Sequence, residues 1–325
     1  MRAISRGRRV LAAVSTVVLL GGCALGSAGE DQAGAPRPQG AVTMVVPFAA
    51  GGGSDISGRA TADGLVSVRP ELRIDVVNRE GGQGAVGYSY LLAKAGSPNF
   101  LLATETSLLA LPLSVDVAFS HRDFTPIVKL GEDHTLLVAR PDSPITSCAD
   151  AVTHSRQRRV LAGVSGAVGP DAVVFDQLER LAGADVDVVP YEGGGETMAA
   201  VLGGQVELAS LNPSEVIGQL RAGSLKALCV FADQRYDHPQ LAHIPTSREQ
   251  GVPVAFAQFR GVIAPGGLSP QATQYWIDAA RDFTASPAYR DYVTSEFLQP
   301  RVAFGADFAA YLADSERALA EVVRR

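Results

Sequence analysis

The residues best suited to chemistry lie in a glycine-rich segment, residues 47–55, between an apolar run and a helical pattern. Three consecutive glycines let a ligand approach the backbone amides closely. Ser54 or Asp55 could cap the helix that follows. Unpaired amides at a helix N-terminus favour an anion without any lysine or arginine. The alternative is a tight turn without a ligand. A phosphate loop is not indicated, because its Gly-Lys-Ser/Thr ending is absent.

A second segment of this kind, residues 163–171, comes close to the nucleophile elbow Gly-x-Ser-x-Gly around Ser165, but Ala167 replaces the last glycine. A hydrolase would also need a histidine base beside Ser165. None of the five histidines is placed there by the sequence. We therefore keep hydrolysis as a minor alternative and interpret the segment as a second set of amide and hydroxyl donors, including Gly166 and Gly169.

Two further strand ends add candidates. Residues 191–196, with Tyr191 and Gly194, form a third glycine-rich turn. Thr104 and Glu105 end another apolar run. If Glu105 faces a ligand cleft, its carboxylate repels a carboxylate ligand and prefers an amine or a hydroxyl. If it caps the next helix, it says nothing about the ligand, and we favour the cap.

The elements that must position these turns are short apolar runs that alternate with helical patterns. Strands are expected at residues 43–47, 74–78, 100–104, 135–139, 160–164, 186–190, 207–211, 225–231 and 259–264. Helices are expected at residues 54–66, 86–95, 172–181, 196–202 and 214–222, and the chain is mostly helical from residue 269. This alternation predicts an α/β fold with mainly parallel sheets covered by helices. Ligands bind such sheets at the carboxyl ends of the strands.

The N-terminus indicates export. Four arginines precede the uncharged run 10–20, which is shorter than the roughly 20 residues of a membrane-spanning helix. This pattern is typical of a secretory signal, residues 1–22. Residues 20–23 resemble the lipobox of bacterial lipoproteins, which implies a lipid on Cys23 and an extracytoplasmic protein anchored to the cell membrane. A plain cleaved signal is the alternative, and the export route, general secretory or twin-arginine, stays open. Residues 23–41 are expected to be a flexible tether.

Composition excludes several classes of function. The formal net charge of −6 argues against nucleic acid and against adhesion to anionic lipid. It does not exclude an anionic ligand, which amides can hold locally. No Cys/His cluster has metal-ligand spacing, so no metal or cofactor is expected. Cys148 and Cys229 could form a disulfide in an exported chain, but their spacing does not show that they meet. The length favours two lobes.

Residues 46–55 resemble the first-loop signature of the substrate-binding proteins of tripartite tricarboxylate transporters, the TctC or Bug receptors. Further matches are residues 76–84, 191–196, 202–206, 221–228, 243–251 and 259–269. The resemblance implies a type II periplasmic-binding-protein fold that closes over its ligand. One lobe would combine residues 42–140 with 260–325, and the other would be residues 141–259. The hinge would lie near 141–144 and 258–260.

The resemblance also implies the site, which has no catalytic residue and no cofactor. The predicted ligand-binding residues are Phe48, Ala49, Gly52, Gly53, Ser54, Asp55, Thr104, Glu105, Ser165, Gly166, Gly169, Tyr191 and Gly194. The expected partners of this monomer are a small organic carboxylate, with a citrate-like acid favoured, and the membrane components of the transporter. Glu80 departs from the proline that the family usually has, and Ser54 from a tryptophan of the tricarboxylate branch. A ligand sensor, or a receptor for another anion or an amino acid, stays open.

Overall fold

The computed structural model describes residues 34–167 and 169–323, which belong to one compact unit. The predicted signal sequence, the lipidation site Cys23 and the tether as far as residue 33 lie outside the described residues. None of the described helices combines the length and the apolar character needed to cross a membrane.

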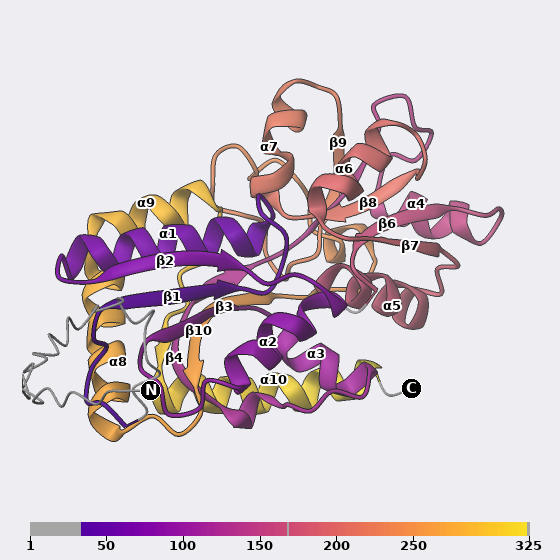
Figure 1. The fold of residues 1–325 in the computed structure, drawn as a ribbon. Coiled ribbons are helices and arrows are strands. Elements are labelled where there is room, and N and C mark those ends of the chain that lie inside the picture. The colour runs from indigo at the N-terminus through magenta and orange to yellow at the C-terminus, as the bar shows by residue number, and fades with distance from the viewer. Residues whose placement is uncertain (1–33, 168, 324–325) are drawn as a thin grey trace, which may run out of the picture. The chain divides into compact units, whose positions relative to one another are not determined.

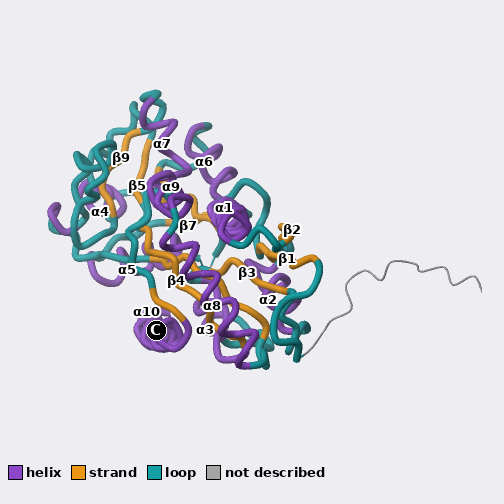
Figure 2. The backbone as a smooth tube through the Cα atoms, turned by 90° about the vertical axis from the view of Figure 1, so that its left-hand side faces the viewer, coloured by secondary structure: helices purple, strands orange, loops and turns teal. Residues whose placement is uncertain are grey.

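The first sheet has the strand order β11-β4-β10-β3-β1-β2 (Figure 1). Its strands are β1 (Ala41–Val46), β2 (Arg73–Asn78), β3 (Phe100–Thr104), β4 (Phe124–Asp133), β10 (Gln258–Pro265) and β11 (Ala303–Phe304). Its helices are α1 (Gly53–Val68), α2 (Ala85–Leu92), α3 (Ser107–Ser114), α8 (Pro270–Ala285), α9 (Pro287–Ser295) and α10 (Gly305–Val323), the last viewed end-on in Figure 2.

The second sheet has the order β7-β6-β8-β5-β9. Its strands are β5 (Leu136–Ala139), β6 (Leu161–Ser165), β7 (Asp187–Tyr191), β8 (Leu208–Leu211) and β9 (Lys226–Val230). Its helices are α4 (Cys148–Ser155), α5 (Pro170–Ala182), α6 (Gly194–Leu202) and α7 (Pro213–Arg221). Short 3-10 helices occur at Gly82–Gly84, His121–Asp123 and Arg248–Gln250.

The expected strands and helices are present within three residues at either end. Strands β4 and β11 and helices α3 and α4 are not predicted by the sequence pattern. Strand β4 was not predicted because Lys129, Gly131 and Glu132 interrupt its apolar pattern. In the structure it pairs with β10 along its whole length. Helix α3 was not predicted because its last turn contains Pro112, and proline normally breaks the interior of a helix.

Both sheets are mixed. The expected parallel pairing holds for β1 with β2 and β3, and for β6 with β7 and β8. Strands β4, β5, β9, β10 and β11 pair antiparallel. Strand β5 belongs to the second sheet, whereas the first lobe was expected to run to residue 140. The chain crosses between the sheets at His134 and Thr135, where no glycine or proline marks the change.

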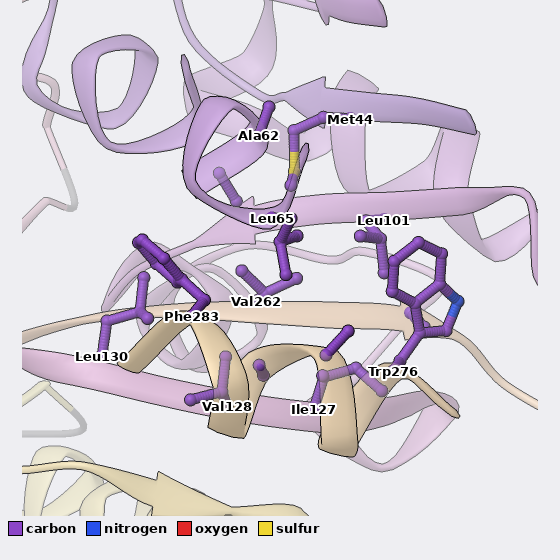
Figure 3. Packing of buried hydrophobic residues seen from close by; sticks show 14 of the residues in the cluster. Met44, Ala62, Leu65, Leu101, Ile127, Val128, Leu130, Val262, Trp276 and Phe283 are labelled. Atoms are coloured by element: carbon purple, nitrogen blue, oxygen red, sulfur yellow. The ribbon is translucent and has the colours of Figure 1, made fainter. Parts of the chain in front are cut away.

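The first sheet has a separate apolar core on each face, because side chains alternate along a strand. Met44 packs toward α1 and α8 on one face, where Trp276 and Phe283 are fully buried (Figure 3). Val45, the next residue, packs toward α2, α3 and α10 on the other face. The Trp276 Nε1 donates to the carbonyl of Pro98 at 3.0 Å. Trp276 is therefore a packing residue of this core.

The core of the second sheet contains a disulfide between Cys148 at the start of α4 and Cys229 in β9. The two Cα atoms are 5.9 Å apart, and the bond links positions separated by 81 residues. Both cysteines are fully buried. The pairing that spacing left undecided is thus settled by the fold, because α4 packs against the strand that carries Cys229.

Candidate ligand-binding cleft

The carboxyl ends of six strands converge on one cavity of about 520 Å³. The turns after β1, β2 and β3 reach it from the first sheet, and those after β6, β7 and β8 from the second. This is the position at which open α/β sheets bind ligands. The start of β10 completes the lining, so the junction between the sheets forms the floor of the cleft.

Most of the predicted site residues meet at this cavity, although they come from distant parts of the chain. Those that line it are Phe48, Ala49, Gly52, Gly53, Ser54, Glu105, Ser165, Gly166, Gly169, Tyr191 and Gly194. Asp55 and Thr104 do not line it.

Asp55 holds the shape of the first loop instead. Its Oδ2 accepts the Gly51 amide and the Arg59 Nε, each at 2.9 Å. Its Oδ1 accepts the Asn78 Nδ2 at 2.9 Å, and the same Nδ2 donates to the Phe48 carbonyl. Burial opposes the charge of the carboxylate, but these bonds outweigh it and lower the pKa of Asp55. Asp55 therefore positions the loop that faces the cavity.

Glu105 both caps a helix and lines the cavity. Its Oε1 accepts the Ser107 amide at 3.1 Å, at the start of α3. The side chain is nearly buried, with 3% exposure, and burial raises the pKa of its carboxyl although Arg260 opposes this effect. The helix cap and the position in the cleft, which the sequence left as alternatives for Glu105, are therefore both present. Thr104, by contrast, pairs its hydroxyl with the Tyr88 hydroxyl at 3.2 Å, away from the cavity.

The second turn is organised by Asp171. Its Oδ2 accepts the Ser165 amide at 3.2 Å, and its Oδ1 accepts the Ser210 hydroxyl at 3.2 Å. Burial, with the charge of Glu215 nearby, raises the pKa of Asp171 to about 7. The Ser165 hydroxyl lies 3.5 Å from that of Thr197. No histidine is among the described residues that line the cavity, so the lining does not supply the base that a Ser165 hydrolase needs.

The lining residues that were not assigned to the site from the sequence include Asn212, Glu215, Gln258 and Arg260 at the cleft floor. The Gln258 Nε2 donates to the Asn212 Oδ1 at 2.7 Å, and Glu215 accepts the Asn212 amide at 3.1 Å. The signal for Glu215 was its place three residues after Asn212, which is the spacing of a capping box. No local pattern distinguishes Arg260, which lies inside an apolar strand.

Two glycines are needed because these side chains press against the backbone. A methyl group on Gly53 would lie 2.9 Å from Nη2 of Arg260 and 3.3 Å from Nδ2 of Asn212. A methyl group on Gly194 would lie 2.3 Å from Oε1 of Glu215. A turn of the first sheet thus approaches Arg260 and Asn212, and a turn of the second sheet approaches Glu215.

Two α/β sheets whose strand ends face a shared cavity define a solute-binding protein of the periplasmic type. The chain belongs to the receptors of the tripartite tricarboxylate transporter family, because the sequence model of that family matches residues 70–324. Proteins of this family bind solutes outside the cytoplasm, so this protein is a binding protein and not an enzyme.

Individual relatives are similar along nearly the whole chain. Protein BugT of Bordetella pertussis is 26% identical over 324 residues, which cover 97% of each chain. An adipate-bound protein of R. palustris superposes with a TM-score of 0.81 at 25% identity, covering 88% of this chain and 97% of that one. The fold is shared with malate-bound MatC of Rhodopseudomonas palustris, with a TM-score of 0.75 at 21% identity over 87% and 98% of the chains.

Proposed function

We propose that this protein captures a small organic carboxylate in the cleft and delivers it to the membrane components of a tripartite tricarboxylate transporter. One observation carries the proposal. Helices α1, α2, α5 and α6 begin after the glycines Gly52, Gly84, Gly169 and Gly193, and all four glycines line the cavity.

A glycine has no side chain that could bond the free amides of the first helical turn. Helices α4, α8 and α9 show the contrast, because each is capped by a serine hydroxyl, at Ser147, Ser269 and Ser286. None of these serines lines the cavity. Helices α1, α2, α5 and α6 thus begin at the cleft without a side-chain cap on their N-cap residue. The dipoles of these helices, and the amides at the starts of α2, α5 and α6, favour a carboxylate.

The two sheets, each with its helices, would act as the two lobes. Contacts from both are available to a ligand only when the lobes are close, so binding shifts an open–closed equilibrium. The crossings at His134–Thr135 and just before Gln258 would serve as the hinge. The closed form would be the one that the membrane components recognise.

The resemblance of the sequence favours a citrate-like tricarboxylate. The acidic lining of the cavity argues against a ligand with so many negative charges. Its lining includes six carboxyl side chains and, among the described residues, one guanidinium, that of Arg260. A ligand with three negative charges would meet more repulsion here than one with a single carboxylate. We therefore propose a carboxylate that carries fewer negative charges than citrate.

A thermal-shift screen of residues 24–325 against mono-, di- and tricarboxylates, amino acids and phosphate tests the receptor function. A saturable rise with one class of carboxylate is expected, because a ligand that binds the folded state stabilises it. Ser165→Ala should weaken that binding without revealing turnover of the ligand. No shift with any carboxylate, alongside a clear shift with phosphate alone, would contradict the proposal.

We also propose that Cys23 carries a lipid that anchors the receptor, a monomer, to the cell membrane. Cys23→Ala is then expected to move the protein from the membrane fraction to the soluble extracytoplasmic fraction. A wild-type protein that is already soluble would disprove the anchor without affecting the ligand site.

A further inference from the structure

The cleft has more acidic groups than a carboxylate ligand by itself would require. Its carboxyl side chains are Glu80, Glu105, Asp171, Glu192, Glu196 and Glu215. Glu80, Glu192 and Glu196 are exposed, whereas Glu105 and Asp171 are buried and Glu215 is partly buried. We call Glu105, Asp171 and Glu215 the inner carboxyl groups.

The guanidinium at the cleft does not balance these groups. Nε and Nη2 of Arg260 both donate to Oδ2 of Asp133, at 3.1 and 3.0 Å. The side chains of this pair are 7% and 4% exposed, so the carboxylate of Asp133 already neutralises the guanidinium. The inner carboxyl groups therefore face the cavity without a cation that balances them when they are charged.

One of the inner carboxyl groups occupies a position that suits an anion. Glu215 extends from the second sheet toward the N-terminus of α1, where the Gly53 amide favours its charged form. The absence of a side chain at Gly194 leaves room for this carboxylate. A ligand carboxylate at the same helix end would be repelled, which leaves the amides at the starts of α2, α5 and α6 for it.

The inner groups lack a positive partner of their own. Burial raises the pKa of both Glu105 and Glu215, although Arg260 acts in the opposite direction on each. A nearby ammonium group would favour their charged forms. A metal ion fits less well, because no group of three or more His, Cys, Asp or Glu side chains in the described part of the chain could hold one. An ammonium group donates three hydrogen bonds, which it can share between carboxyl groups and neutral acceptors.

We propose that the ligand is an amino-substituted carboxylate, whose carboxylate lies at the glycine-capped starts of α2, α5 and α6 and whose ammonium group lies against Glu105 and Glu215. This inference rests on the proposed receptor function and narrows its ligand. It makes Glu105 and Glu215 specificity-determining residues that select against a second carboxylate at their end of the cleft.

Titration calorimetry of the full-length protein in detergent tests the inference. The probes are adipate, glutarate and succinate, each compared with the amino acid in which an ammonium group replaces one carboxylate. The wild type is expected to bind the best amino acid at least about tenfold more tightly than its dicarboxylate partner. Glu105→Gln and Glu215→Gln should each remove most of that preference. Glu179→Gln, at an exposed position of α5 outside the cavity lining, should retain it.

The outcomes separate this inference from the receptor function. Tighter binding of a dicarboxylate by the wild type would overturn the inference and leave the receptor function standing. A preference for the amino acid that persists in both glutamine variants, each folded by circular dichroism, would overturn the roles of Glu105 and Glu215. Binding of neither ligand class would overturn the inference and the proposed function together.

Discussion

Arg260 and Asp133 form a buried ion pair at the junction of the two sheets, with two hydrogen bonds of 3.1 and 3.0 Å to one carboxylate oxygen. Asp133 is the last residue of β4, where the chain leaves the first sheet, and Arg260 lies in β10, where it returns. The Arg260 Nη1 also reaches the Ser54 hydroxyl at 3.4 Å. The pair therefore connects the crossing segments to the first loop of the cleft.

Asp133→Asn should strongly destabilise the protein, because it leaves the Arg260 guanidinium buried beside a neutral amide. We expect a loss of about 3 kcal/mol in the free energy of unfolding, measured with urea. Asp142→Asn is the matched control, since its ion pair with Arg140 is exposed and should contribute less than about 1 kcal/mol. Equal effects of the two changes would show that the buried pair has no special role.

Reduction of the disulfide between Cys148 and Cys229 should destabilise the fold of residues 24–325. A cross-link that closes a loop of this length restricts the unfolded chain and is expected to contribute about 4.5 kcal/mol. Urea unfolding with and without reductant measures the difference. The double variant Cys148→Ala/Cys229→Ala is the control and should not respond to reductant. An unchanged midpoint for the wild type would contradict the prediction.

Gly194→Ala and Gly195→Ala compare neighbouring positions in the first turn of α6. A methyl group at Gly194 would displace the Glu215 carboxylate, whereas one at Gly195 would meet no atom within 4 Å. We expect Gly194→Ala to lower the free energy of unfolding by about 1 kcal/mol. Gly195→Ala should leave it equal or higher, because alanine favours helix. A larger loss of stability for Gly195→Ala than for Gly194→Ala would rule out the close approach of Glu215.

The pKa of Asp171, raised to about 7, predicts how stability depends on pH. The folded protein retains this proton between pH 4 and 7, whereas the unfolded chain releases it near pH 4. Stability should therefore fall as the pH rises through this window, by at most roughly 1.4 kcal/mol per pH unit from this group. Asp171→Asn should flatten the dependence, as measured by urea unfolding at several pH values. Parallel curves for the two proteins would contradict the assignment.

Much of the fold could be predicted from local pattern. Alternating apolar runs and helical periods placed most strands and helices, and the glycine-rich segments marked the turns at their ends. The three segments around Gly53, Ser165 and Gly194 do meet at one cavity. The turns around Ser165 and Gly194 are neighbours because the carboxyl ends of the parallel strands β6 and β7 share one edge of the second sheet. The turn around Gly53 meets them because the carboxyl ends of the first sheet face the same cavity.

Other features depend on which distant residues become neighbours. The charge of Arg260 is balanced by Asp133, 127 positions away in the chain, and Cys148 pairs with Cys229 across 81 positions. Glu105 caps α3 and also lines the cleft. From the sequence around Glu105 these two roles could be given only as alternatives. The sequence by itself determined most of the elements and the glycine-rich turns, because these follow from short-range patterns, and its resemblance to known receptors indicated the family. Only the tertiary structure decided the charge of the cleft, because burial and the distances between charges exist only once the sheets have packed.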